Sequence, residues 1–140
     1  MRQLDDWIAG YLRYTRNLEA PTTFHFWTAI SILAATVNSK VWLDMGRWTW
    51  RPNFYIILFG PPGIVTKSTT IGIGESLLSE VPGVAWGPSS VTWQALLTAF
   101  SESTRTVETP QHKFQTSPIF ITSSELGTFL NPDDREMIER

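Results

Sequence analysis

The stretch FYIILFGPPGIVTKST, residues 54–69, decides the fold that the sequence predicts. It opens with six apolar residues, among which only Tyr55 carries a polar group, and such runs are typical of strands buried on both faces of a parallel sheet. Glycine and proline follow at once, and residues 67–81 then have the pattern of a helix. We expect Gly72 and Gly74 within that helix to permit close packing on the sheet. The order strand, glycine-containing loop and helix is the setting of a phosphate-binding loop.

The loop after this strand contains the residue types that hold nucleotide phosphates. Gly60 and Gly63 permit a backbone whose N–H groups converge on an anion, and the start of the next helix adds to the positive field. Lys67 can reach the β- and γ-phosphates, and the Ser68 hydroxyl is the expected Mg²⁺ ligand. We therefore expect ATP and Mg²⁺ as cofactors. The predicted nucleotide-binding residues are Gly60, Pro61, Pro62, Gly63, Thr66, Lys67, Ser68 and Thr69.

The spacing of this loop departs from the standard Walker A pattern, G-x-x-x-x-G-K-[ST]. With Lys67 as the lysine, the glycines would stand at positions 61 and 66, which hold proline and threonine. Counted from Gly60, the loop is one residue longer than the standard. We expect the extra residue to bulge out at Ile64 and Val65. The alternative interpretation is a structural turn between a strand and a helix, with an ordinary solvated lysine.

A phosphate loop needs an acidic partner at the end of a neighbouring strand, where it holds Mg²⁺ through water or activates the attacking water. Residues 118–122, PIFIT, are a second apolar run with the character of a strand, and Glu125 follows them after two serines. Glu125 is therefore the predicted catalytic base. The other interpretation is that Glu125 caps a short helix over residues 126–130.

The remaining elements follow from hydrophobic periodicity and from turn residues. We expect helices over residues 5–17, 22–37 and 91–100, a hairpin over residues 41–50, a short strand over residues 84–86 and a loop over residues 111–117. From residue 54 onward strands alternate with helices, which favours an α/β fold with a mainly parallel sheet. The predicted domains are residues 1–52, with helices and a hairpin, and residues 53–140, the first part of a P-loop ATPase core.

Composition limits the classes of protein and partner. The chain of 140 residues is 42% hydrophobic and 17% charged, which is ordinary for a globular domain. It has no cysteine, which excludes disulfides and thiolate metal sites and fits the cytoplasm. The longest apolar stretch, residues 27–37, is too short to span a bilayer, so no membrane partner is expected.

The net charge of −2 gives no general indication of nucleic acid binding. The best local cluster of basic and aromatic residues lies on the predicted hairpin, and its members are candidate DNA contacts because bases stack on aromatic rings. The tryptophans of this cluster could equally belong to a core or an interface. The cluster consists of Arg47, Trp48, Trp50 and Arg51.

Residues 24–140 resemble the P-loop ATPase part of phage and prophage primase-helicases, which are RecA-like proteins. The resemblance lies in FWTAISILAATVNSKVWLDMGRWTWRPNFYIILFGPPG, KSTT, VPGVAWGPSSVTWQALLTAF and SELGTFLNPDDREMI. It implies that ATP hydrolysis is coupled to movement on DNA during replication, commonly by a homo-oligomeric ring. It also implies that Lys67 and Ser68 bind phosphate and Mg²⁺, with Glu125 as the acidic residue of the second motif.

The resemblance further implies strands, a sensor residue and an arginine from a neighbouring subunit, none of which can be located after residue 125. We therefore expect the chain to be a fragment or a shortened product that hydrolyses ATP poorly on its own. The alternative function is a nucleotide-independent interaction module, a truncated helicase-like protein that binds or poisons a helicase ring.

Overall fold

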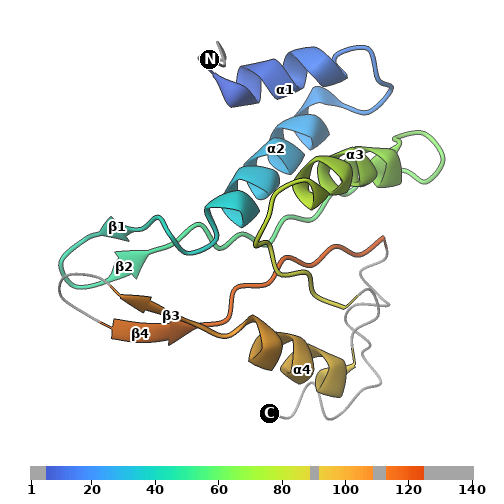
Figure 1. The fold of residues 1–140 in the computed structure, drawn as a ribbon. Coiled ribbons are helices and arrows are strands. Elements are labelled where there is room, and N and C mark those ends of the chain that lie inside the picture. The colour runs from blue at the N-terminus through green and yellow to red at the C-terminus, as the bar shows by residue number, and fades with distance from the viewer. Residues whose placement is uncertain (1–5, 89–91, 109–112, 125–140) are drawn as a thin grey trace. The chain divides into compact units, whose positions relative to one another are not determined.

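A computed structural model of the chain describes residues 6–88, 92–108 and 113–124 (Figure 1). The chain divides into two compact units between Pro82 and Gly83. The predicted domain boundary between residues 52 and 53 lies inside the first unit. The elements are α1 (Trp7–Thr15), α2 (Thr22–Val37), β1 (Leu43–Asp44), β2 (Thr49–Trp50), α3 (Lys67–Ser79), α4 (Trp93–Ser103), β3 (Arg105–Glu108) and β4 (Lys113–Thr116).

Three helices form the core of the first unit, and α2 packs against both α1 and α3. Asp6 caps α1, because its Oδ1 accepts a hydrogen bond of 3.0 Å from the backbone N–H of Ala9. Asn38 ends α2 in the left-handed region, with φ of 45°. The helices predicted over residues 5–17, 22–37 and 67–81 are confirmed. The buried side chains of these helices are Tyr11, Thr15, His25, Thr28, Ala29, Ile32, Thr70 and Leu78.

Gly74 brings α3 into close contact with α2. A Cβ atom at this position would stand 2.6 Å from Cγ2 of Thr28 and 3.2 Å from Cδ1 of Ile32. A Cβ atom at Gly72 would meet nothing within 4 Å. The expectation that both glycines pack on a sheet is therefore wrong, since one glycine packs on a helix and the other faces open space.

The predicted hairpin is confirmed as an antiparallel pair of β1 and β2, in which Leu43 lies opposite Trp50 and Asp44 lies opposite Thr49. Its turn places Gly46 at φ of 79°, a conformation that favours glycine. The Asp44 carboxylate accepts a hydrogen bond of 2.8 Å from the Gly46 N–H, which holds the turn.

The strand predicted over residues 54–59 is not present: this segment pairs with no described strand. Tyr55 and Phe59 are 91% and 92% exposed, so the segment is not buried on both faces either. An apolar run becomes a central strand only where other strands form hydrogen bonds with both of its edges. Among the described residues of the first unit, the strands are the two of the hairpin, and they pair with each other.

The second unit contains α4 and a second antiparallel hairpin. Thr92 caps α4, because its Oγ1 accepts a hydrogen bond of 3.2 Å from the Ala95 N–H. β3 pairs with β4 from Arg105 opposite Thr116 to Glu108 opposite Lys113. The loop predicted over residues 111–117 is therefore wrong for residues 113–116, which form β4. Their polar side chains suit an exposed hairpin edge as well as a loop.

The strands predicted over residues 84–86 and 118–122 appear as one parallel bridge between Trp86 and Phe120. Two backbone hydrogen bonds of 2.8 Å flank it, from Gly87 N–H to Phe120 O and from Phe120 N–H to Ala85 O. The described residues thus form a mixed α and β structure with two small antiparallel sheets. The predicted mainly parallel sheet is not among them.

Candidate phosphate-binding loop

The loop over residues 60–66 has two backbone features that depend on residue type. Gly63 has φ of +74°, in the left-handed region that glycine adopts at little cost. Thr66 has φ of −68° and ψ of 62°, and the N–H of Lys67 donates a hydrogen bond of 2.6 Å to the carbonyl of Val65. These values define an inverse γ-turn centred on Thr66. Because this turn has negative φ, the residue before the lysine need not be glycine.

Lys67 closes the loop. Its Nζ donates a hydrogen bond of 2.6 Å to the carbonyl oxygen of Gly60, seven residues earlier in the chain. The side chain is half-buried, so the ammonium group lies against the loop backbone and is not fully solvated. This hydrogen bond therefore links Gly60, the first residue of the loop, to Lys67, the first residue of α3, and holds the ammonium group between them.

The first turn of α3 presents backbone donors beside this cation. No described residue accepts a hydrogen bond from the N–H of Ser68 or of Thr69, and both residues are exposed. The third N–H is used internally, because Thr70 donates to the Thr66 carbonyl from both its backbone and its hydroxyl, at 3.1 and 3.0 Å. Free N–H groups and the helix dipole make this end of α3 attractive to an anion.

Two apolar side chains support the loop from inside the unit. A Cβ atom at Gly60 would stand 2.5 Å from Cγ2 of Val65 and 3.5 Å from Cζ of Phe24. Glycine is therefore needed at position 60 for the close approach of Val65. Ile64 is 72% exposed and points away from this contact. Sequence reasoning identified Gly60 and Lys67 but missed Phe24 as a support, because an apolar residue gives no sign of which backbone it will cover. The expectation that Val65 bulges out with Ile64 is wrong, since Val65 is half-buried against Gly60.

The other predicted site residues lie in different places. Pro61 and Pro62 are exposed in the loop. Arg47 and Arg51 are exposed on the β1–β2 hairpin, as are the tryptophans between them. Glu125 lies outside the described residues, so its role stays a prediction.

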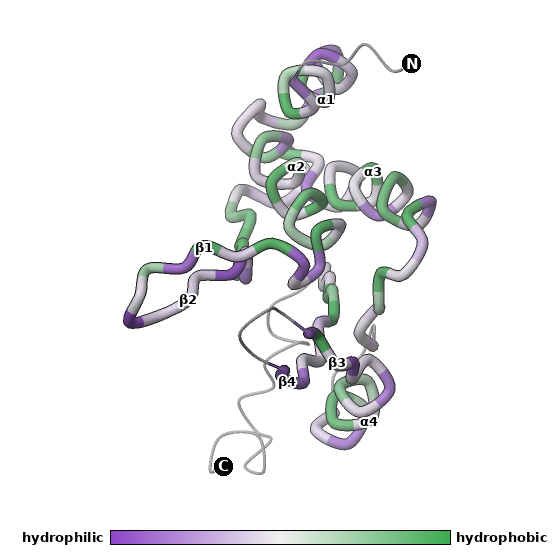
Figure 2. The backbone as a smooth tube through the Cα atoms, turned by 60° about the vertical axis from the view of Figure 1, so that its left-hand side comes forward, coloured by the Kyte–Doolittle hydropathy of each residue, from purple (hydrophilic) through white to green (hydrophobic). Residues whose placement is uncertain are grey.

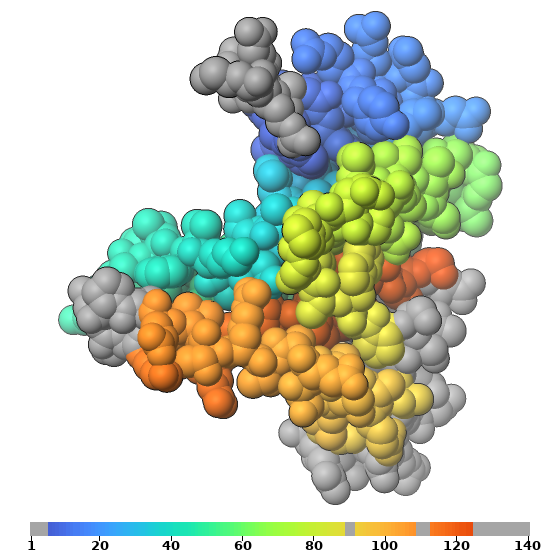
Figure 3. Space-filling view, viewed as in Figure 1, coloured from blue at the N-terminus to red at the C-terminus, as the bar shows by residue number. Residues whose placement is uncertain are grey.

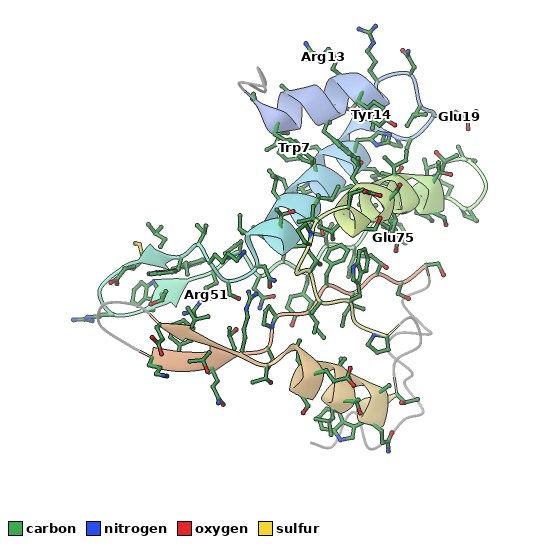
Figure 4. All side chains as sticks on the ribbon, in the orientation of Figure 1. Trp7, Arg13, Tyr14, Glu19, Arg51 and Glu75 are labelled. Atoms are coloured by element: carbon green, nitrogen blue, oxygen red, sulfur yellow. The ribbon has the colours of Figure 1, made fainter. Side chains whose placement is uncertain are left out.

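A groove of about 390 Å³ begins where the loop ends. It lies between α1 and α3, and Tyr14, labelled in Figure 4, lines it from α1. Thr69 borders both the loop and the groove. The open space beside Gly72 belongs to this groove, which explains why that glycine has no close neighbour.

A buried polar pair lies between α1 and α2, away from the predicted site residues in sequence. His25 is 2% exposed, and neither of its ring nitrogens has a hydrogen-bond partner among the described residues. Burial lowers the pKa of His25 below 6.5. The Tyr11 ring lies 6.3 Å away, and burial, with a smaller contribution from Tyr14, raises the pKa of Tyr11 to about 12. Tyr11 Oη likewise has no partner in this part of the structure.

In the described ranges, no three His, Cys, Asp or Glu side chains come together to hold a metal ion. Ser68 is exposed at the start of α3. Among the residues that the structure describes, no helix has the length and apolar character needed to cross a membrane. No protein-family model, curated protein or solved structure matches the chain.

Proposed function

We propose that residues 60–69 bind the phosphates of ATP, as the phosphate loop of a P-loop ATPase domain. The observation that carries this proposal is the hydrogen bond between Lys67 Nζ and the Gly60 carbonyl, which holds a cation against the loop backbone. Left-handed Gly63 and the N–H groups of Ser68 and Thr69 add a suitable backbone around it.

Binding would exchange one partner of the lysine for another. In the structure the ammonium group is bonded to a neutral carbonyl, and a phosphate oxygen is a stronger acceptor because it is charged. Lys67 would leave Gly60 for the phosphate, while the N–H groups of Ser68 and Thr69 would donate to the same anion. Mg²⁺ would be held by the Ser68 hydroxyl together with phosphate oxygens and water, which is how this ion is commonly bound.

The wider function in this proposal rests on the resemblance to phage primase-helicases. There the loop would belong to a parallel-sheet ATPase core, and Glu125 would activate the attacking water. ATP hydrolysis would be coupled to DNA unwinding or translocation in a homo-oligomeric ring.

Isothermal titration of the full chain with Mg-ATP tests the loop. We expect Lys67→Ala to weaken binding by about 10-fold to 150-fold, since a hydrogen bond to a charged group contributes about 1.5–3 kcal/mol. Lys113→Ala is the matched control: it removes the same charge from the second unit, where Lys113 pairs with Glu108 at 2.5 Å. An unchanged affinity in Lys67→Ala would reject the proposal.

A second candidate function is a nucleotide-independent interaction module. The observation that favours it is the exposure of Tyr55 and Phe59, 91% and 92%, in the uncharged segment 54–59. Exposed apolar segments without strand partners are common docking sites for other chains. Light scattering of the chain mixed with a replicative helicase, without nucleotide, would test this function. Co-assembly that Tyr55→Asp abolishes would support it, and separate elution would exclude the version that poisons a helicase ring.

A further inference from the structure

The register of the β1–β2 hairpin places four apolar side chains on one face. Leu43 lies opposite Trp50, and the N–H of Met45 donates a hydrogen bond of 3.0 Å to the Trp48 carbonyl across the turn. Because side chains alternate along a strand, residues two apart share a face. One face therefore carries Leu43, Met45, Trp48 and Trp50, and the other carries Asp44 and Thr49, with Trp42 and Arg51 on that second face by the same alternation.

The apolar face is open to solvent. Its four side chains are 61%, 52%, 57% and 61% exposed, in the order Leu43, Met45, Trp48 and Trp50. Figure 3 shows the hairpin in teal, extending from the helices of the first unit. Two tryptophans on one exposed face are costly to leave in water without a partner, so this face has the character of an interaction site.

The charge of the hairpin is opposite to that of the rest of the chain. Residues 40–51 contain Lys40, Arg47 and Arg51 but only one acid, which gives a local charge of +2 and leaves −4 on the remainder of a chain whose total is −2. The acid, Asp44, already accepts the Gly46 N–H. Arg47 lies in the turn between β1 and β2, and Figure 2 shows that the tip of this hairpin is hydrophilic. Arg51 follows β2, where Figure 4 labels it. A partner that is both anionic and aromatic would match the positive charge of the hairpin and stack on its exposed tryptophans.

The spacing of the rings suits stacked bases. Trp48 and Trp50 are two residues apart on the same face, which separates them by about 6.6 Å along the strand. This distance is close to twice the 3.4 Å rise of stacked bases in a nucleic acid strand. A base can therefore stack on either ring, with its phosphate near Arg47 at the turn.

We propose that the β1–β2 hairpin is a binding surface for single-stranded nucleic acid, with bases stacked on Trp48 and Trp50 and a phosphate held by Arg47 at the turn, while Lys40 and Arg51 add to the positive charge of the hairpin. The alternation of cations with exposed tryptophans over such a short segment distinguishes it from an apolar protein-binding patch, where charged residues are depleted at the centre. This surface is independent of the phosphate loop, and its test does not involve ATP.

Fluorescence anisotropy of labelled (dT)12 and (rU)12, titrated with the full chain at 50 and 200 mM salt, tests the proposal. We expect Trp48→Ala/Trp50→Ala to bind at least about tenfold more weakly, because one base stacked on an aromatic ring accounts for about 5-fold to 150-fold in affinity. Arg47→Ala should reduce the slope of log affinity against log salt by about 0.7, the share of one phosphate contact on a single strand. Comparison of the two oligonucleotides shows whether DNA or RNA is preferred.

Two further variants separate loss of rings from loss of structure. Trp48→Phe/Trp50→Phe keeps an aromatic ring at both positions, so it should retain most of the affinity. Tyr14→Ala removes an aromatic side chain that is 72% exposed on α1, and it should leave oligonucleotide binding unchanged. The proposal is overturned if the wild-type chain does not bind at 50 mM salt, or if the double alanine variant binds as well as the wild type. Binding to anionic vesicles in place of oligonucleotides would overturn it in favour of a lipid surface.

Discussion

The contact between α2 and α3 at Gly74 gives a prediction in which helix propensity can be separated from packing. Gly72 and Gly74 both lie within α3, two residues apart. A methyl group at Gly72 would enter open space, whereas one at Gly74 would meet Cγ2 of Thr28 at 2.6 Å and Cδ1 of Ile32 at 3.2 Å. Thr28 and Ile32 are both buried, and Thr28 is β-branched, so neither can easily turn away.

The changes in stability caused by Gly72→Ala and Gly74→Ala should therefore differ in sign or in size. Replacing glycine with alanine inside a helix stabilises it by about 0.5–1 kcal/mol, and this gain applies to both variants. Overpacking a tight contact costs about 1–3 kcal/mol, and this cost applies only at Gly74. Gly72→Ala should thus stabilise the chain, and Gly74→Ala should be about 1–3 kcal/mol less stable than Gly72→Ala.

Thermal and urea unfolding of the full chain, followed by far-ultraviolet circular dichroism, measures this difference. We expect the Tm of Gly74→Ala to lie at least about 4 °C below that of Gly72→Ala, given about 4–8 °C per kcal/mol for a unit of this size. Thr28→Ser removes only the methyl group that Gly74 faces, so it should recover part of the loss in the double variant. Equal stability of the two alanine variants would refute this account of the packing of α2 on α3.

Three other predictions concern single side chains. Burial lowers the pKa of His25, so as the pH falls the unfolded chain binds a proton at this residue before the folded chain does. The free energy of unfolding should therefore decrease as the pH falls below about 6.5. This decrease in the free energy of unfolding, at most about 1.4 kcal/mol per pH unit, should be absent from His25→Phe. An equal dependence on pH in the wild type and the variant would contradict the prediction. Tyr11→Phe removes a buried hydroxyl that has no partner among the described residues, so it should raise the free energy of unfolding or leave it unchanged, while a loss above about 1 kcal/mol would show a missed hydrogen bond. Glu125→Gln should keep Mg-ATP affinity and lower any measured hydrolysis, and undiminished hydrolysis would exclude Glu125 as the base.

Helices and short hairpins could be predicted because their signals are local. In α1 the periodic residue Tyr11 is buried, and Gly46 marks the turn between β1 and β2. In α2 the bounds follow from the pattern but the packed face does not, because the buried residues are His25, Thr28, Ala29 and Ile32 while Trp27 is exposed. Residues 54–59 have an equally strong local signal, yet they form no strand in the structure. A strand requires partners, and an apolar run does not specify which segments will pair with it.

Some features of the candidate site could likewise be predicted from the sequence, and others could not. Lys67 and Ser68 could be identified from residue type and spacing, although the spacing is irregular. The γ-turn at Thr66 and the cover of Gly60 by Val65 could not be, because both depend on backbone angles and close approaches that sequence does not encode locally. The misplaced glycine of the motif is explained by that turn, in which threonine has an ordinary negative φ.

The most direct test of the phosphate loop is to locate a bound polyphosphate by amide NMR. Inorganic triphosphate with Mg²⁺ is the right probe, because it has no base that could stack on the tryptophans of the hairpin. In spectra of ¹⁵N-labelled full chain, we predict that the largest changes occur at the amides of Gly63, Ser68 and Thr69, and that Lys67→Ala removes them. Changes that are absent at these amides, or that centre on Arg47 and its neighbours, would contradict the central claim that residues 60–69 form a phosphate-binding loop.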